Sequence, residues 1–196
     1  MHIFLASASP RRQELLNQIS VPFSVVRSDF VEATTTVSGQ TVTDLVEQNA
    51  LGKARGAFPL PHRGLCVGAD TEVICDGRIL GKPASLAEAR DMLRCLSGRV
   101  HTVVSGVAVV DESGKYITGH SLTDVAFRDL TESEISAYLG TGESMDKAGA
   151  YGIQGKGALF VTAVQGCYFN VMGLPLSLLA SLLSRGFGID LTDMWR

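Results

Sequence analysis

Hydrophobic and polar residues follow one another along this chain in blocks that predict strands and helices. Short apolar runs rich in β-branched residues predict strands at residues 2–6, 23–26, 65–67 with 72–74, 100–110, 123–127 and 159–164. Apolar residues repeated every three or four positions predict helices instead. These helices begin at Ser9-Pro10, at Thr41 or Thr43, at Ser85, at Thr131 and after Pro175.

The order of these elements indicates the fold class. Strands and helices alternate only in part, and a long antiparallel stretch with turns at Gly77 and Ser113-Gly114 fills the middle. This order favours an α/β fold, with a mixed sheet flanked by helices, over a strict doubly wound fold. Since no repeat, low-complexity tract or shift in composition marks a linker, we expect a single domain over residues 1–196.

Composition and charge narrow the class of protein. With 196 residues, 45% of them hydrophobic, the chain is long enough to bury a core without metal or disulfides. A net charge of -3 argues against a nucleic-acid groove or a basic membrane patch. The most apolar stretch, 171–183, is interrupted by Gly173 and Pro175 and is shorter than the ~20 residues that span a bilayer. The cysteines stand singly without a CxxC pair. We therefore expect a cytoplasmic protein without a zinc site.

A carboxylate interrupts one of the apolar strands, in the stretch Gly68-Ala69-Asp70-Thr71. Asp70 either faces solvent, is tied to backbone donors, or is held beside a pocket for chemistry. Gly68 allows another backbone or a ligand to come close. Glu32 is the candidate second carboxylate, because hydrolysis of a phosphoanhydride needs a divalent ion and activation of water. The sequence does not show that the two carboxylates meet.

Three basic segments are candidates for phosphate binding. Ser7 to Arg12 offers a helix start, two hydroxyls and two guanidinium groups, although an ordinary capped helix has the same residues. Lys82, between Gly81 and Pro83, is either a point charge for a phosphate or a lysine in a surface turn. Lys53 borders the apolar stripe of the second helix and suits phosphate binding or simple snorkelling.

A glycine-rich segment, 146–155, is the candidate for recognition of a base. Its glycines allow close backbone approach, and Gln154 has both a donor and an acceptor for a base edge. The alternative is a glycine-rich loop without a ligand. His101 is either a general base or a strand residue with a structural hydrogen bond. Because no P-loop or GxGxxG spacing is present, kinase and dinucleotide-binding functions lose support.

Several of these segments, in this order, resemble the Maf family of nucleoside triphosphate pyrophosphatases. The matching segments are 5–12, 68–71, 81–83, 96–101, 146–155 and 170–175. The resemblance implies an elongated, two-lobed fold like that of inosine triphosphate pyrophosphatases, and a homodimer. It also implies a nucleoside triphosphate substrate, cleaved between the α- and β-phosphates with Mg²⁺ or Mn²⁺.

The resemblance also implies roles for single residues. Asp70 matches the proton acceptor, and with Glu32 it is a candidate metal ligand. The positions associated with phosphate, metal or base contact are Ser9, Arg12, Glu32, Lys53, Lys82 and Gln154. Arg12, Thr71 and Gln154 resemble the combination of the dTTP/UTP subfamily. The chain departs from the family pattern at 30–33 and at 48–50, which lie next to Glu32 and Lys53.

The functional hypothesis is hydrolysis of dTTP and UTP, with modified pyrimidine nucleotides as further candidates, to the monophosphate and pyrophosphate. One alternative is a broader house-cleaning pyrophosphatase for modified nucleotides. Another is a non-catalytic, nucleotide-binding regulator of cell division and septum formation. We expect neither a nucleic-acid nor a membrane partner.

Overall fold

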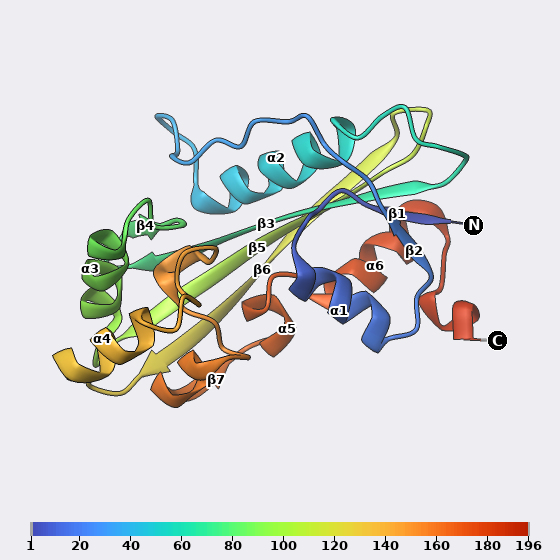
Figure 1. Cartoon of the computed structure of the whole chain (residues 1–196). Coiled ribbons are helices and arrows are strands. Elements are labelled where there is room, and N and C mark those ends of the chain that lie inside the picture. Colours follow the sequence, from blue (N-terminus) through green and yellow to red (C-terminus); the bar gives the residue numbers. More distant parts are fainter. Residues whose placement is uncertain (1, 196) are drawn as a thin grey trace. The chain divides into compact units, whose positions relative to one another are not determined.

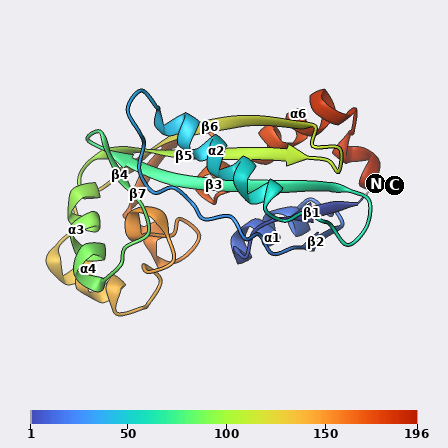
Figure 2. The same ribbon diagram turned by 90° about the horizontal axis from the view of Figure 1, so that it is seen from above.

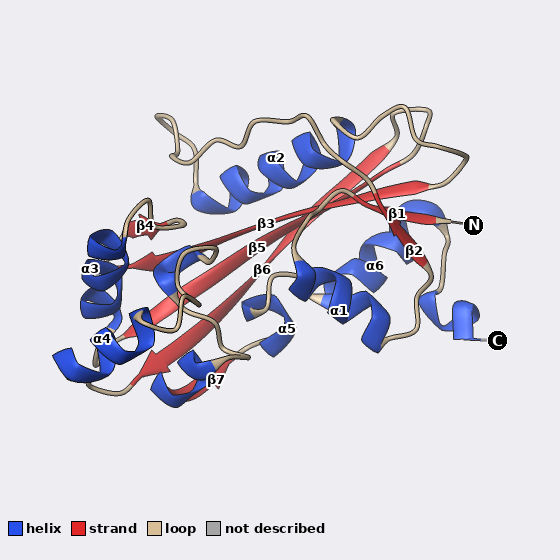
Figure 3. Cartoon of the chain, viewed as in Figure 1, coloured by secondary structure: helices blue, strands red, loops and turns tan. Residues whose placement is uncertain are grey.

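The strands of the computed structural model, which describes residues 2–195, form one sheet (Figure 3). Its order is β2-β1-β3-β5-β6-β7, and β4 pairs with β3 outside this path. The strands are β1 (Ile3–Leu5), β2 (Phe23–Val25), β3 (Leu65–Cys75), β4 (Arg78–Leu80), β5 (Val100–Val110), β6 (Tyr116–Phe127) and β7 (Val161–Gln165). β1 is parallel to β2 and β3, whereas β3–β4 and β6–β7 are antiparallel, so the predicted mixed α/β sheet is confirmed.

The helices begin largely where the capping residues predict (Figure 1). They are α1 (Pro10–Gln18), α2 (Val42–Arg55), α3 (Leu86–Leu96), α4 (Glu132–Leu139), α5 (Tyr168–Val171) and α6 (Leu176–Phe187), with 3-10 helices η1 (Ala148–Ala150), η2 (Lys156–Phe160) and η3 (Leu191–Trp195). Thr41 and Thr131 each form a capping box with the acidic residue three positions later. Pro10 is the first residue of α1, as predicted, but the Ser9 side chain forms no capping hydrogen bond.

The chain divides into two compact units. The first unit contains Met1–Asp70, Ser105–Ser121 and Gly173–Arg196, and the second contains Thr71–Val104 and Leu122–Met172. Strands β3, β5 and β6 contribute residues to both units, and Asp70 is the last residue of β3 in the first unit. A single domain over residues 1–196 stays a prediction.

In the first unit, helix α2 lies directly on the strands. A Cβ atom on Gly68 of β3 would lie 2.0 Å from the Ala50 carbonyl oxygen, and one on Gly106 of β5 would lie 2.3 Å from that of Val46. Only glycine permits this approach of two backbones. In both views α2 runs beside β3 (Figures 1 and 2). The contact fixes which α2 side chains reach Asp70.

The second unit is built around the β3–β4 hairpin and a pair of helices. The hairpin turns at Asp76 and Gly77, both with positive φ, in agreement with the predicted turn. Helices α3 and α4 lie side by side, and Arg94 pairs with Glu132 at 2.6 Å. His101, Phe127, Tyr151 and Phe160 form a buried group of rings, which we call the aromatic cluster.

The structure differs from the predicted elements in several places. The predicted strand 159–164 begins only at Val161, because the glycine-rich turn before it continues as η2, with the Ala158 amide bonded to the Gly155 carbonyl at 3.1 Å. Helices α5 and η3, only 4 and 5 residues long, carry too few periodic positions to be predicted.

Across residues 2–195, the helices are all too short or too polar to cross a membrane.

Candidate active site

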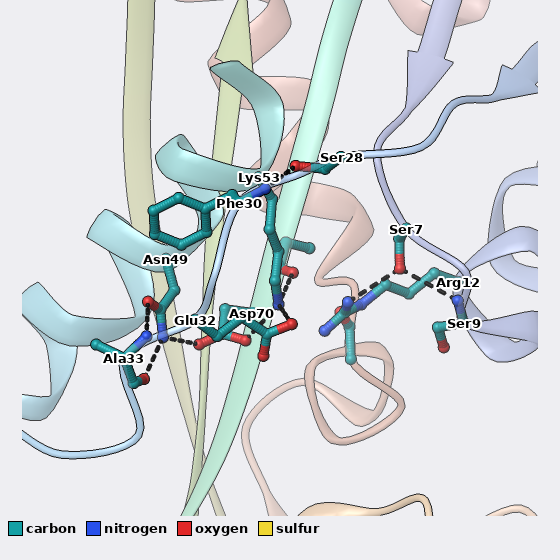
Figure 4. Close-up of polar contacts among 12 residues, drawn as sticks. Ser7, Ser9, Arg12, Ser28, Phe30, Glu32, Ala33, Asn49, Lys53 and Asp70 are labelled. Carbon is teal, nitrogen blue, oxygen red and sulfur yellow. Dashed lines mark hydrogen bonds and ion pairs between the residues drawn. The ribbon is translucent and has the colours of Figure 1, made fainter. Parts of the chain in front are cut away.

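Asp70 is buried, so it is not a solvated strand residue. Its exposed fraction is 4%. The Lys53 ammonium donates to Oδ1 at 2.7 Å, and the Asn49 amide donates to Oδ2 at 2.8 Å (Figure 4). Both donors come from α2, which approaches because residue 68 is glycine. Each oxygen of the carboxylate therefore has a donor.

Lys53 joins the two predicted carboxylates. Its Nζ atom lies 3.1 Å from Oε1 of Glu32 and 2.7 Å from Oδ1 of Asp70, and it donates to the Ala69 carbonyl at 3.2 Å. The sequence placed Lys53 at the rim of the apolar stripe, but the side chain is buried. A buried ammonium is stable when it is paired and hydrogen-bonded, as it is here. Glu32, Lys53 and Asp70 thus come together.

Asn49 completes this group and was not predicted as a site residue. It stands on α2 one turn before Lys53, with an exposed fraction of 1%. Besides its bond to Asp70, its amide bonds the backbone of Ala33, the residue after Glu32 (Figure 4). The sequence did contain a signal for Asn49, because a residue four positions before Lys53 lies on the same face of the helix. We call Glu32, Asn49, Lys53 and Asp70 the carboxylate cluster.

Arg12 is anchored on the other side of Asp70. Its Nε donates to the Gly173 carbonyl at 2.7 Å and its Nη1 donates to the Ser7 hydroxyl at 3.1 Å. Figure 4 shows the guanidinium pointing toward Asp70. Burial lowers the pKa of Arg12, while Asp70 and Glu32 oppose that shift. An arginine still carries its charge at neutral pH, so a fixed cation stands beside the carboxylates.

Ser9 lies at the start of α1, where the Ser7 hydroxyl accepts from the Ser9 amide at 3.3 Å. Its own hydroxyl does not cap the helix. The helix start, the Ser7 hydroxyl and Arg12 thus occupy one small region of the first unit. Arg12 is therefore not a freely solvated arginine, and anion binding by this segment stays a prediction.

Lys82, Thr71 and Gln154 belong to the second unit. Thr71 is half-buried, whereas Lys82 and Gln154 are exposed. The loops of the last two are joined, because the Gly149 amide donates to the Gly81 carbonyl at 3.2 Å. The structure therefore brings together the candidate base-reading loop and the Gly81-Lys82-Pro83 loop. These loops belong to the second unit, whereas the carboxylate cluster belongs to the first.

His101 has the structural role that was one of its two predicted alternatives. Its Nε2 bonds the Tyr151 hydroxyl at 2.8 Å, and its ring packs edge-on against Phe127. Burial lowers the pKa of His101 to about 4 and raises that of Tyr151. Both groups are neutral at pH 7, so the pair holds the glycine-rich segment without carrying charge.

A comparison with known protein families shows to which family the chain belongs. The model of the family described as "Maf-like protein" matches residues 2–186. The chain belongs to the Maf family. The resemblance carried by the six sequence segments is therefore confirmed.

Curated relatives match this Maf-family chain over nearly its whole length. A protein named dTTP/UTP pyrophosphatase from Moorella thermoacetica is 50% identical over 189 residues, which cover 96% of each chain. Proteins of the same name from Bacillus cereus strain AH187 and Clostridioides difficile are 46% and 43% identical, covering 97% of this chain and 97% and 98% of theirs. A solved HAM1 protein from Coxiella burnetii is 19% identical with a TM-score of 0.49, covering 94% of this chain and 99% of that one.

Outside the carboxylate cluster, the described part of this Maf-family chain has one group of three side chains that could together hold a metal ion. Their ligand atoms, on Cys75, Asp76 and Cys95, lie within 4.8 Å of one another. Burial raises the pKa of Cys75 to about 11, and Asp76 pairs with Arg99 at 2.5 Å. At neutral pH the thiol stays protonated and the carboxylate is already paired, so the group is poorly prepared for a cation. Because Cys75 and Cys95 are 20 positions apart, their spacing gave no signal.

Proposed function

We propose that this Maf-family protein is a nucleoside triphosphate pyrophosphatase that hydrolyses dTTP and UTP to the monophosphate and pyrophosphate. The observation that carries the proposal is the buried Asp70 carboxylate, held by Lys53 and Asn49 beside Glu32. The relatives that bear this activity in their names, at 43–50% identity, support the choice of substrates.

The carboxylate cluster suits a hard divalent cation. Glu32 and Asp70 already share one positive charge, the Lys53 ammonium, between their oxygens. Mg²⁺ and Mn²⁺ take carboxylate oxygens, and Mg²⁺ typically uses one or two of them together with water and substrate phosphates. We assign Glu32 and Asp70 as the protein ligands. The ion, when bound, neutralises phosphate charge and polarises the phosphoryl oxygens.

In the proposed reaction, a water oxygen attacks the α-phosphorus while the bond from that phosphorus to the α,β-bridging oxygen breaks. Asp70 orients the water and accepts its proton, and pyrophosphate leaves with the bonding electron pair. Arg12 and Lys53 stabilise the charge that develops on the leaving pyrophosphate. Fixed cations are effective in this role because they need no reorganisation during the reaction.

Residues outside the carboxylate cluster hold the rest of the substrate. We assign Ser9 at the start of α1 to a phosphate oxygen, and Lys82 to the pyrophosphate as a point charge. Thr71 and Gln154 read the pyrimidine edge, because an amide side chain matches a donor and an acceptor together. The bonded loops of Gly81 and Gly149 support joint action by Lys82 and Gln154.

The proposal extends to the surroundings of the enzyme. We expect a cytoplasmic homodimer that acts on free nucleotides, without a nucleic-acid or membrane partner. The net charge of -3 supports this expectation, because it offers no general attraction to polyanions. Light scattering of the purified protein tests the dimer, and a monomer at assay concentration contradicts it.

A substrate panel tests the proposed function. The purified protein is assayed with dTTP, UTP, CTP and 7-methyl-GTP, with Mg²⁺ and with Mn²⁺, by detecting pyrophosphate. We expect dTTP and UTP to give the highest kcat/KM, with one monophosphate formed per pyrophosphate. Higher kcat/KM for modified nucleotides would favour a house-cleaning enzyme. Nucleotide binding without turnover would favour a regulator of cell division.

A further inference from the structure

The Asn49 side chain uses its amide on three partners that belong to two separate parts of the first unit. Oδ1 accepts from the Ala33 amide at 3.0 Å, while Nδ2 donates to the Ala33 carbonyl at 2.8 Å and to Oδ2 of Asp70 at 2.8 Å (Figure 4). Both N–H groups and the oxygen of this amide are therefore engaged. At this degree of burial, losing any of the three bonds leaves a polar group without water to replace the partner.

The two bonds to Ala33 fix a segment that has little other regular support. Residues 26–41 form neither helix nor strand and are mostly exposed, with Val31 at 86%. Asn49 pairs with both backbone groups of Ala33, much as a neighbouring strand would. Since Ala33 directly follows Glu32, this pairing sets the point from which the Glu32 carboxylate reaches Lys53.

The third bond fixes the orientation of Asp70. Asn49 and Lys53 are four residues apart on α2, so their side chains lie on one face of the helix. The amide takes Oδ2 and the ammonium takes Oδ1 of the same carboxylate. A carboxylate with one fixed donor on each oxygen has a defined rotation about its Cβ–Cγ bond.

We propose that Asn49 is a positioning residue, which holds the Glu32 loop and the Asp70 carboxylate in one geometry for the divalent ion and the attacking water. This inference rests on the proposed function and deepens it. An amide is required, because aspartate cannot donate to Ala33 and Asp70, and leucine of similar size offers no hydrogen bond. Asn49 lies in the 48–50 segment in which this chain departs from the family pattern.

The test compares Asn49→Leu and Asn49→Asp with Asn17→Leu, the same change at an exposed asparagine of α1. All variants are assayed under conditions in which circular dichroism shows that they are folded. At saturating dTTP, we expect both Asn49 variants to lose about ten- to hundredfold in kcat, the range seen when partners of metal ligands are removed. Asn17→Leu should keep the wild-type kcat.

Two further readouts do not depend on turnover. Hydrogen exchange at the Ala33 amide should become faster in the Asn49 variants, and titration with Mn²⁺ alone, followed by EPR, should show about tenfold weaker binding. Wild-type kcat, Mn²⁺ affinity and exchange in the Asn49 variants would overturn the inference while leaving the proposed function intact. If the wild-type protein hydrolyses neither dTTP nor UTP, the proposed function falls, and the exchange and Mn²⁺ results still decide the role of Asn49.

Discussion

The chain buries polar side chains in two clusters that treat charge in opposite ways. In the carboxylate cluster of the first unit, the ammonium of Lys53 stands between Asp70, at 2.7 Å, and Glu32, at 3.1 Å. In the aromatic cluster of the second unit, His101 and Tyr151 share one hydrogen bond at 2.8 Å and burial keeps both neutral. Burial by itself therefore does not identify a functional group.

The difference favours the carboxylate cluster as the place of the proposed chemistry. Desolvating a charge is expensive, and a neutral group of similar volume would often be equally stable or more stable. The carboxylate cluster keeps its charges, as an enzyme that binds a cation and a triphosphate requires. The aromatic cluster avoids charge and supports packing. The predictions below test this contrast through the free energy of unfolding.

The largest expected effect is the loss of the Lys53 charge. Lys53→Met leaves the buried Asp70 carboxylate without its ion pair, so we expect the free energy of unfolding to fall by about 3–5 kcal/mol. Urea denaturation measures this loss. The double variant Lys53→Met/Asp70→Asn should recover part of it, because the unpaired charge is gone. A loss below ~1 kcal/mol would mean that the pair behaves as an exposed one.

The next largest effect is a fall in the free energy of unfolding at acid pH, caused by protonation of His101. Unfolded histidine binds a proton near its ordinary pKa of 6.5, whereas folded His101 does so only near 4. The unfolded state therefore binds more protons between these values, and stability falls as the pH falls from 6.5 to 4, by about 3 kcal/mol. Above pH 6.5 this contribution does not change with pH.

Chemical denaturation at several pH values measures the acid effect. His101→Gln should flatten the stability curve between pH 6.5 and 4, whereas the exposed control His62→Gln should not. An equally steep curve in His101→Gln would show that other groups cause the loss, and would remove the evidence that this cluster excludes charge.

The smallest effect is expected for the hydroxyl of Tyr151. Tyr151→Phe leaves the buried Nε2 atom of His101 without its partner, which costs about 1–3 kcal/mol. Turnover of dTTP should stay within about twofold, since the cluster supports packing. Thermal unfolding and initial rates measure the two quantities, with the exposed Tyr168→Phe as a control. Reduced turnover with unchanged stability would assign the aromatic cluster to the site.

Local features of the fold could be predicted from the sequence because they depend on neighbouring residues. The helix starts at Thr41 and Thr131 and the turn at Gly77 involve residues only a few positions apart. The same holds for the strand around Asp70, although its burial was one of several alternatives. The interruption of an apolar strand made Asp70 a candidate, and the resemblance to known sequences assigned it a role.

Contacts between distant segments could not be predicted from the sequence. The bonds of Asn49 to Ala33 and to Asp70 span 16 and 21 positions and depend on how closely α2 approaches β3. The same approach buries Lys53, which periodicity placed at a rim. Gly68 carried the signal of close approach, but it did not say which backbone would come near.

The central claim is that the Asp70 carboxylate performs the chemistry, and the kcat of Asp70→Asn with dTTP tests it most directly. The amide keeps the size of the side chain but removes the charge and the proton acceptor, so we expect a loss of about 10²–10⁴-fold in a folded variant. A folded Asp70→Asn protein with wild-type turnover of dTTP would contradict the account.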